Sequence, residues 1–94
     1  MTEHALMRLE EHSLTLASNG LSPLALTEAI KRVCENPEDF DRSHGGKRYS
    51  CFSLNRFYII VVYKSEGLRV TIITVILTTE PRVMLKKCGR ARRL

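Results

Sequence analysis

His4, Arg8 and His12 follow one another at intervals of four residues near the start of the sequence. On a helix this spacing places successive side chains about 40° apart in projection, so all three share one side. An imidazole can move a proton near neutral pH, and a guanidinium can hold a phosphate with paired donors. These groups therefore have the parts needed for phosphodiester chemistry. The alternative is a solvated helix surface, which is the commoner role of such residues.

The β-forming part of the sequence mixes cationic and tyrosine side chains. A sheet surface of that kind can bind single-stranded RNA through phosphate contacts and stacking. The same residues also suit a half-buried sheet whose edges are kept soluble by charge. The cations are Arg56, Lys64 and Arg69, and the tyrosines are Tyr49, Tyr58 and Tyr63.

The net charge of +5 is unevenly distributed along the chain. Residues 1–40 are net acidic, residues 41–80 are net basic, and residues 81–94 carry basic side chains without a single acid. Such asymmetry favours a polyanion, RNA or DNA, as a partner. A solvated, partly disordered tail is the alternative. The cations of this tail are Arg82, Lys86, Lys87, Arg90, Arg92 and Arg93.

Length and motif content exclude several classes of protein. A chain of 94 residues is too short for a multidomain enzyme with its own dinucleotide fold. The most apolar run, residues 57–63, is too short to span a bilayer, so we expect no membrane segment. Residues 44–48 lack the glycine spacing of a P-loop and are better interpreted as a connector.

The cysteines and histidines predict no metal site, because the three residues of each type are scattered without ligand spacing. We expect no other cofactor either. The first residues lack the basic and apolar regions of a signal peptide, which favours the reducing cytoplasm.

Two helices followed by three strands are predicted from the pattern of apolar and turn-forming residues. Thr2 caps a first helix that runs to about Leu16. Ser22-Pro23 opens a second helix, and Asn36-Pro37 ends it. The last strand is continuously apolar, which indicates a central or well-covered position. The expected strands cover residues 47–54, 57–63 and 68–78, with a loop over 38–46 and a turn over 64–67.

These elements predict an α+β fold, in which two N-terminal helices pack on a three- to four-stranded antiparallel sheet. Residues 1–80 form the single domain. Residues 81–94 form a basic C-terminal tail, which can add a short helix or strand to the fold.

Short motifs follow in a definite order along residues 3–78: His4-Ala5-x-x-Arg8, Glu35-Asn36-Pro37-Glu38, Gly46-Lys47-Arg48-Tyr49, Val61-Val62-Tyr63 and Val70-Thr71-Ile72-Ile73-Thr74-Val75. This series resembles the RelE/BrnT-like toxin superfamily, in particular its small single-domain branch that opens with His-Ala-x-x-Arg. The resemblance implies a RelE-like arrangement of helices on a curved antiparallel sheet. This chain differs from that family in having His12 and Ser13 where an arginine and a glycine are usual. It also differs in residues 15–21, which look like an insertion.

The resemblance also implies an activity, that of a metal-independent ribonuclease in a toxin–antitoxin pair. Such a toxin, of the mRNA interferase type, cuts RNA through attack of a 2′-hydroxyl on the adjacent phosphate. By carry-over, His4 is the proton-transfer group and Arg8 a phosphate clamp, and Lys64 and Thr74 are weaker additions to the catalytic set. The expected partners are RNA and a protein antitoxin. We add as nucleic-acid contacts Arg56, from its place beside the sheet, and the tail residues Lys86, Lys87, Arg90, Arg92 and Arg93.

Two other classes of function remain open at this point. One is a non-catalytic nucleic-acid-binding protein that relies on Arg90, Arg92 and Arg93 rather than on His4. The other is a protein-interaction module of the same fold, with a homodimer formed through the sheet edge.

Overall fold

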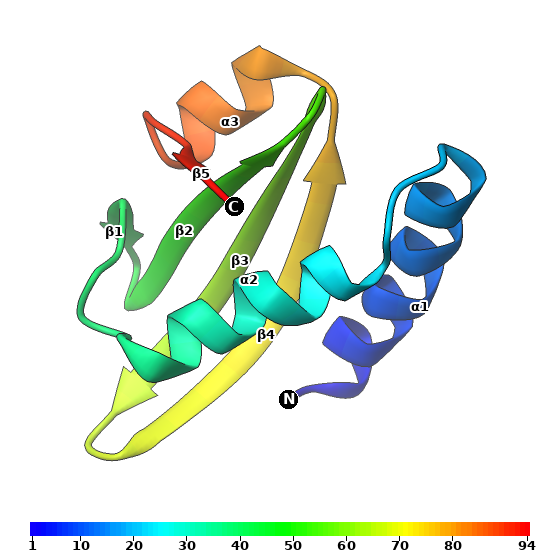
Figure 1. The fold of residues 1–94 in the computed structure, drawn as a ribbon. Coiled ribbons are helices and arrows are strands. Elements are labelled where there is room, and N and C mark those ends of the chain that lie inside the picture. The colour runs from blue at the N-terminus through cyan, green and yellow to red at the C-terminus, as the bar shows by residue number, and fades with distance from the viewer.

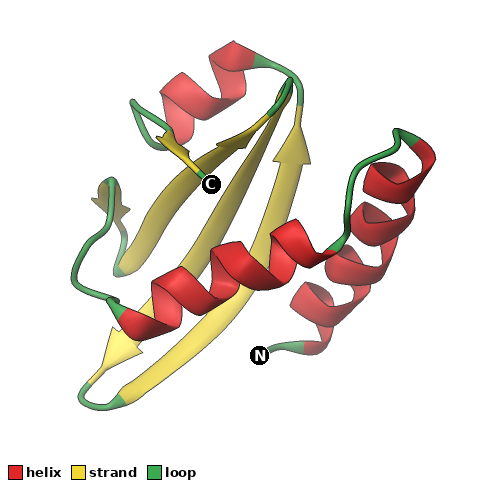
Figure 2. Cartoon of the chain, in the orientation of Figure 1, coloured by secondary structure: helices red, strands yellow, loops and turns green.

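The computed structural model describes all of residues 1–94, and Figures 1 and 2 show the arrangement of its elements. Four strands form an antiparallel sheet in the order β1-β2-β3-β4, and a short fifth strand pairs in parallel with β2. Helix α2 crosses one face of the sheet, and α1 lies beside β4 (Figure 1). The elements are α1 (Glu3–Ser18), α2 (Leu24–Glu35), β1 (Arg42–His44), β2 (Lys47–Leu54), β3 (Phe57–Glu66), β4 (Arg69–Thr78), α3 (Pro81–Lys87) and β5 (Arg92–Arg93).

The two N-terminal helices begin and end close to the predicted residues. The Thr2 side chain accepts a hydrogen bond from the backbone N–H of Ala5, which caps the first turn of α1. Helix α1 ends at Ser18, two residues later than predicted, and Gly20 follows with a φ of 73°. Helix α2 begins directly after Pro23 and ends before Asn36. Local capping and turn chemistry therefore account for both helices.

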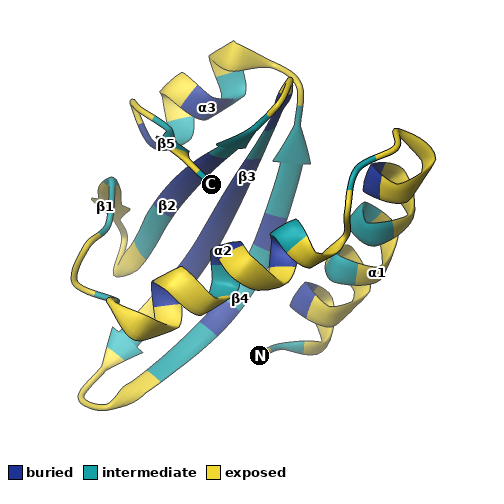
Figure 3. Ribbon diagram, in the orientation of Figure 1, coloured by how far each residue is buried: buried dark blue, intermediate teal, exposed yellow.

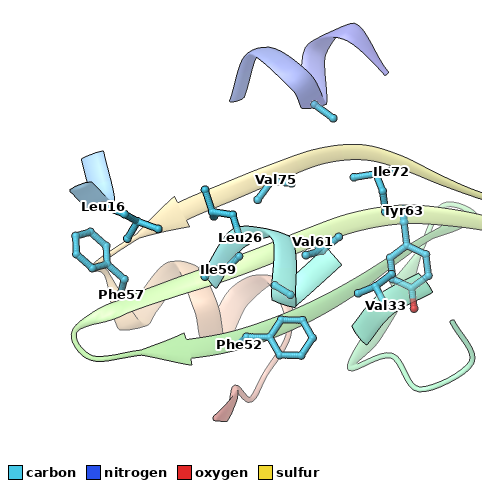
Figure 4. Close-up of a cluster of buried hydrophobic side chains, with 12 residues drawn as sticks. Leu16, Leu26, Val33, Phe52, Phe57, Ile59, Val61, Tyr63, Ile72 and Val75 are labelled. Carbon is cyan, nitrogen blue, oxygen red and sulfur yellow. The ribbon is translucent and has the colours of Figure 1, made fainter. Parts of the chain in front are cut away.

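The main hydrophobic core lies between α2 and one face of the sheet, and Figures 3 and 4 show its buried residues. Leu26, Ala29 and Val33 recur along α2 at the spacing of one helical face. Every second residue of β3 faces them, because side chains alternate across a strand. The full cluster comprises Ala5, Leu16, Leu26, Ala29, Val33, Phe52, Phe57, Ile59, Val61, Tyr63, Ile72 and Val75.

A smaller core on the opposite face of the sheet is covered by α3. It contains the alternate residues of β3, Ile60 and Val62, together with Met84 of α3. Cys51 and Cys88 are buried there as free thiols. A hydrogen bond to Cys88 and burial raise the pKa of the Cys51 thiol. This second core ties residues 81–94 to the sheet.

Thr2, the N-cap of α1, and His12 of α1 hydrogen-bond to carbonyls on the outer edge of β4. The backbone N–H of Thr2 donates to the carbonyl of Ile72 at 3.2 Å, and the Thr2 hydroxyl donates to the carbonyl of Ile73 at 2.9 Å. Ile73 is the extra residue of a β-bulge, since Val62 pairs with Thr74 while Tyr63 pairs with Ile72. The start of α1 is thus attached to the point where the β3–β4 ladder is interrupted.

Four groups in succession hydrogen-bond along the outer edge of β2. Strand β1 pairs with its first residues and β5 with its last. Between them, the Asp41 carboxylate accepts the backbone N–H of Cys51 at 2.8 Å. Beyond β5, the N–H of Leu94 donates to the carbonyl of Ser53 at 3.1 Å. The Asp41 side chain, which is 0% exposed, therefore acts as a spacer between two strands.

The structure confirms the predicted α+β class with two N-terminal helices on an antiparallel sheet. Several details were wrong. Strand β3 extends to Glu66, so the turn is limited to residues 67 and 68, and the predicted loop over 38–46 contains β1. The apolar strand β4 lies at the end of the sheet path rather than at its centre, but α1 covers it, so of the two predicted positions the well-covered one is confirmed.

Residues 81–94 contribute both a short helix and a short strand to the structure. Groups of this same chain hydrogen-bond to carbonyls on the outer side of β4, whereas β1 ends the sheet path at the other edge. No helix is long and apolar enough to cross a membrane.

The buried Tyr63 makes stability sensitive to alkaline pH. Its hydroxyl donates to the carbonyl of Pro37 at 2.7 Å, and burial raises its pKa above the ordinary value of 10.0. The unfolded chain loses this proton at a lower pH than the folded protein does. The free energy of unfolding should therefore fall above about pH 10, by at most roughly 1.4 kcal/mol per pH unit from this group.

Tyr63→Phe tests this prediction by urea unfolding at about pH 8 and about pH 10.5. At the lower pH, the variant should have a free energy of unfolding about 1 kcal/mol below that of the wild type, because phenylalanine cannot form the hydrogen bond to Pro37. Between the two pH values, its free energy of unfolding should fall less than that of the wild type. Arg48 still donates to the Pro37 carbonyl at 2.9 Å, which limits the first effect. Tyr58→Phe in the same strand is the control. An unchanged pH dependence in Tyr63→Phe would contradict the assignment.

Candidate active site

One side of α1 and the outer strand β4 form an open pocket of about 440 Å³. His4, Arg8 and His12 line it from successive turns of α1. The opposite wall consists of β4 residues 74–77, of which Thr74 supplies a hydroxyl. The four-residue spacing in the sequence does bring the three polar side chains of α1 together, and the sheet adds Thr74 to them.

His12 is the fixed member of the group. Its Nε2 lies 2.9 Å from the carbonyl oxygen of Val75, and a carbonyl can only accept, so Nε2 carries a proton. Nδ1 is then the acceptor of a neutral ring or a second donor of a charged one. The half-buried imidazole is therefore oriented by β4, and it attaches the middle of α1 to the sheet edge.

Arg8 is held in place only loosely. Its Nη1 lies 3.0 Å from a carboxylate oxygen of Glu11, and the two side chains are 46% and 55% exposed. An exposed pair of this kind contributes about 0–1 kcal/mol. A phosphate can compete for the guanidinium, which has further N–H donors beyond the one facing Glu11.

His4 is the second residue of α1, and its exposed side chain lines the pocket. Its neighbours in the pocket are polar groups of the same helix and the edge of β4. Because His4 and Arg8 are both accessible, a macromolecular substrate can reach them without displacing part of the fold.

The other catalytic candidate, Lys64, lies outside this pocket. It is exposed near the end of β3, opposite Thr71 of β4. Arg56 is also outside the pocket, in the turn between β2 and β3, where it hydrogen-bonds to the Asn19 side chain and lies 5.4 Å from the Phe57 ring centroid. The structure thus brings together His4, Arg8 and Thr74, but neither Lys64 nor Arg56.

Two cations of the tail form ion pairs within the fold. Arg90 and Arg92 form ion pairs with Asp41, at 2.7 and 3.3 Å, and Arg92 also pairs with Asp39 at 2.7 Å. They neutralise carboxylates of the segment that precedes β1, so much of their charge is used within the fold.

Lys86 and Lys87 differ from these arginines, because they form no ion pair and line a separate pocket beside β1. Arg93 belongs to β5, and its carbonyl accepts from Arg32. The tail therefore presents its cations at several places rather than as one basic surface.

The sequence did not indicate that Asp39 and Asp41 form ion pairs with arginines of the tail. It also did not indicate that His12 hydrogen-bonds to the edge of β4. The signal for the two aspartates is an acidic segment placed just before the most basic half of the chain. No group of three His, Cys, Asp or Glu side chains is arranged to hold a metal ion.

Comparison with known proteins gives no family assignment. No protein-family model, no curated protein and no solved structure matches this chain.

Proposed function

We propose that this chain cleaves RNA without a metal ion at the pocket between α1 and β4, as the toxin of a toxin–antitoxin pair. The observation that carries the proposal is the convergence of two imidazoles, a guanidinium and a hydroxyl in one open pocket, from His4, His12, Arg8 and Thr74. Cleavage through a 2′-hydroxyl needs a base, an acid and a cation near the phosphorus, and the pocket contains all three.

In the proposed reaction, His4 accepts the proton of the 2′-hydroxyl as the oxygen attacks the adjacent phosphorus. The bond from phosphorus to the 5′-oxygen breaks, and the leaving oxygen takes a proton from the second imidazole, that of His12, which donates it from Nδ1 of its charged form while Nε2 stays bound to Val75. The products are a 2′,3′-cyclic phosphate and a 5′-hydroxyl end. Arg8 contacts the non-bridging oxygens, on which negative charge develops in the transition state.

The test uses an oligodeoxynucleotide that carries one ribonucleotide, incubated with the purified chain in EDTA. Cleavage should occur only after the ribonucleotide and should leave a cyclic phosphate, since no other position has a 2′-hydroxyl. Cleavage at deoxynucleotide positions would contradict the mechanism. A parallel reaction contains mRNA on ribosomes, because a toxin of this type can require them. Absence of cleavage in both reactions would reject the enzymatic proposal.

The cellular part of the proposal is that the protein acts in the cytoplasm and is neutralised there by a protein antitoxin. Free thiols at Cys34, Cys51 and Cys88 suit a reducing compartment. Induced expression should stop growth, and His4→Ala should relieve the arrest. A growth arrest that His4→Ala does not relieve would contradict a toxin that acts through this pocket.

The second candidate function is nucleic-acid binding without cleavage. Lys86 and Lys87, free of ion pairs, favour it. Deleting residues 82–94 is a poor test, because it also removes α3 and β5 and uncovers the second core. Substitution of individual cations, followed by the salt dependence of binding, separates charge from fold.

A further inference from the structure

A pocket of about 320 Å³ lies between β1, the start of β2 and the end of α3, at the edge of the sheet opposite α1. Its lining is almost entirely polar and contains no carboxylate. The residues are Arg42, Ser43, His44, Tyr49, Lys86 and Lys87.

The pocket is assembled by a contact between β1 and the end of α3. Arg42 donates from Nη1 to the carbonyl of Lys86 at 2.8 Å, and this carbonyl belongs to the last turn of the helix. Gly89 lies beside this contact: its φ of 80° favours glycine, and a Cβ there would lie 3.0 Å from Nη2 of Arg42. The cations of two distant segments are thus brought together by specific packing.

The charges in this pocket are not balanced by acids. Arg42, Lys86 and Lys87 form no ion pair, whereas Arg8, Arg32, Arg48, Arg90 and Arg92 each pair with a carboxylate. The pocket beside α2 gives the contrast, because its Arg32 and Arg92 lie beside Glu35 and Asp39. Several cations that converge without an acid attract a ligand with more than one negative charge.

We propose that the pocket lined by Arg42, His44, Lys86 and Lys87 binds the phosphate group of a nucleotide, either free or within a single-stranded RNA. A guanidinium and two ammonium groups match the oxygens of a phosphate dianion. The Ser43 hydroxyl adds a donor, and the half-buried Tyr49 supplies a ring on which a base can stack. This inference goes beyond the proposed cleavage reaction and does not depend on it.

The experiment is a titration of the ¹⁵N-labelled chain followed by backbone amide shifts. The probes are inorganic phosphate, adenosine 5′-monophosphate and a hexauridylate, each compared with sodium chloride at equal ionic strength. Saturable shifts should appear at residues 42–44 and 86–87 with all phosphate probes and not with chloride. A free nucleotide as the source predicts that the monophosphate binds more tightly than the hexauridylate, and an RNA strand predicts the reverse order.

The matched variants carry the same change of charge at different places. Lys86→Gln/Lys87→Gln removes two cations of the pocket and should weaken binding of every phosphate probe at least tenfold. Lys31→Gln/Arg82→Gln removes two exposed cations outside the pocket and should weaken it less than twofold. The amide spectrum of each variant shows whether it is folded.

Two results would overturn the proposal. One is the absence of saturable shifts at residues 42–44 and 86–87 with phosphate. The other is equal weakening by the two double variants, which would mean that only the overall charge matters. Both results are independent of RNA cleavage, so failure here and failure of the proposed function can be told apart.

Discussion

Replacing His4 by alanine is expected to lower the rate of RNA cleavage by about 10²–10⁴-fold, the usual contribution of a positioned acid or base. The residue is exposed in the first turn of α1 and lies outside both buried clusters. The substitution should therefore leave the free energy of unfolding within about 0.5 kcal/mol of the wild type. Single-turnover cleavage of the oligodeoxynucleotide that carries one ribonucleotide measures the rate, and urea unfolding measures the free energy of unfolding.

Three further variants of α1 make this result specific. Arg8→Ala should also reduce cleavage, whereas Glu11→Gln leaves the guanidinium without its partner and should preserve activity. Glu10→Ala alters another exposed residue of the same helix, outside the pocket, and is the control. If His4→Ala and Arg8→Ala both remain folded and fully active, the reaction does not take place at this pocket.

Replacing Asp41 by alanine should lower the free energy of unfolding by about 3 kcal/mol. The carboxylate is 0% exposed and accepts from the backbone of Cys51, from Arg90 and from Arg92. Its removal leaves a backbone N–H without a partner at the point where the edge of β2 passes from β1 to β5. The arginines are partly exposed and can turn to water, which keeps the loss from being larger.

Asp39→Ala is the matched control for this prediction, because Asp39 pairs with the same Arg92 but is 51% exposed. It should cost less than about 1 kcal/mol. Asp41→Asn keeps an acceptor for Cys51 and should fall between the two. Urea unfolding of the three variants gives the comparison. A loss in Asp41→Ala no greater than that in Asp39→Ala would show that the spacer role is wrong.

The elements that sequence patterns predicted well are those specified by local chemistry. Thr2, Pro23 and Pro37 mark helix boundaries through capping and backbone restriction, and these act within a few residues. The strands β1 and β5 were not predicted individually, because two or three residues carry no periodic signal. They are strands only because β2 offers them an edge.

In the candidate active site and the tail, too, local patterns were predictable from the sequence and long-range contacts were not. Helical spacing was enough to place His4, Arg8 and His12 in one pocket, since four-residue intervals determine a common side. The sequence could not reveal that Arg90 and Arg92 meet Asp41, because those contacts join residues about 50 positions apart along the chain. The sequence favoured Arg90, Arg92 and Arg93 as binding cations, and only packing shows that Arg90 and Arg92 are ion-paired while Lys86 and Lys87 are not.

The hydrogen bonds that α1 and the C-terminal residues make along the outer sides of β4 and β2 have a consequence for the folding reaction. Until α1 docks, the carbonyls of Ile72, Ile73 and Val75 remain free along β4, and until residues 92–94 dock, part of β2 is unpaired. Such a partly folded chain exposes two apolar strand edges that can pair with another molecule. Refolding should therefore lose yield to aggregation as the protein concentration rises, even though the native protein keeps these edges covered.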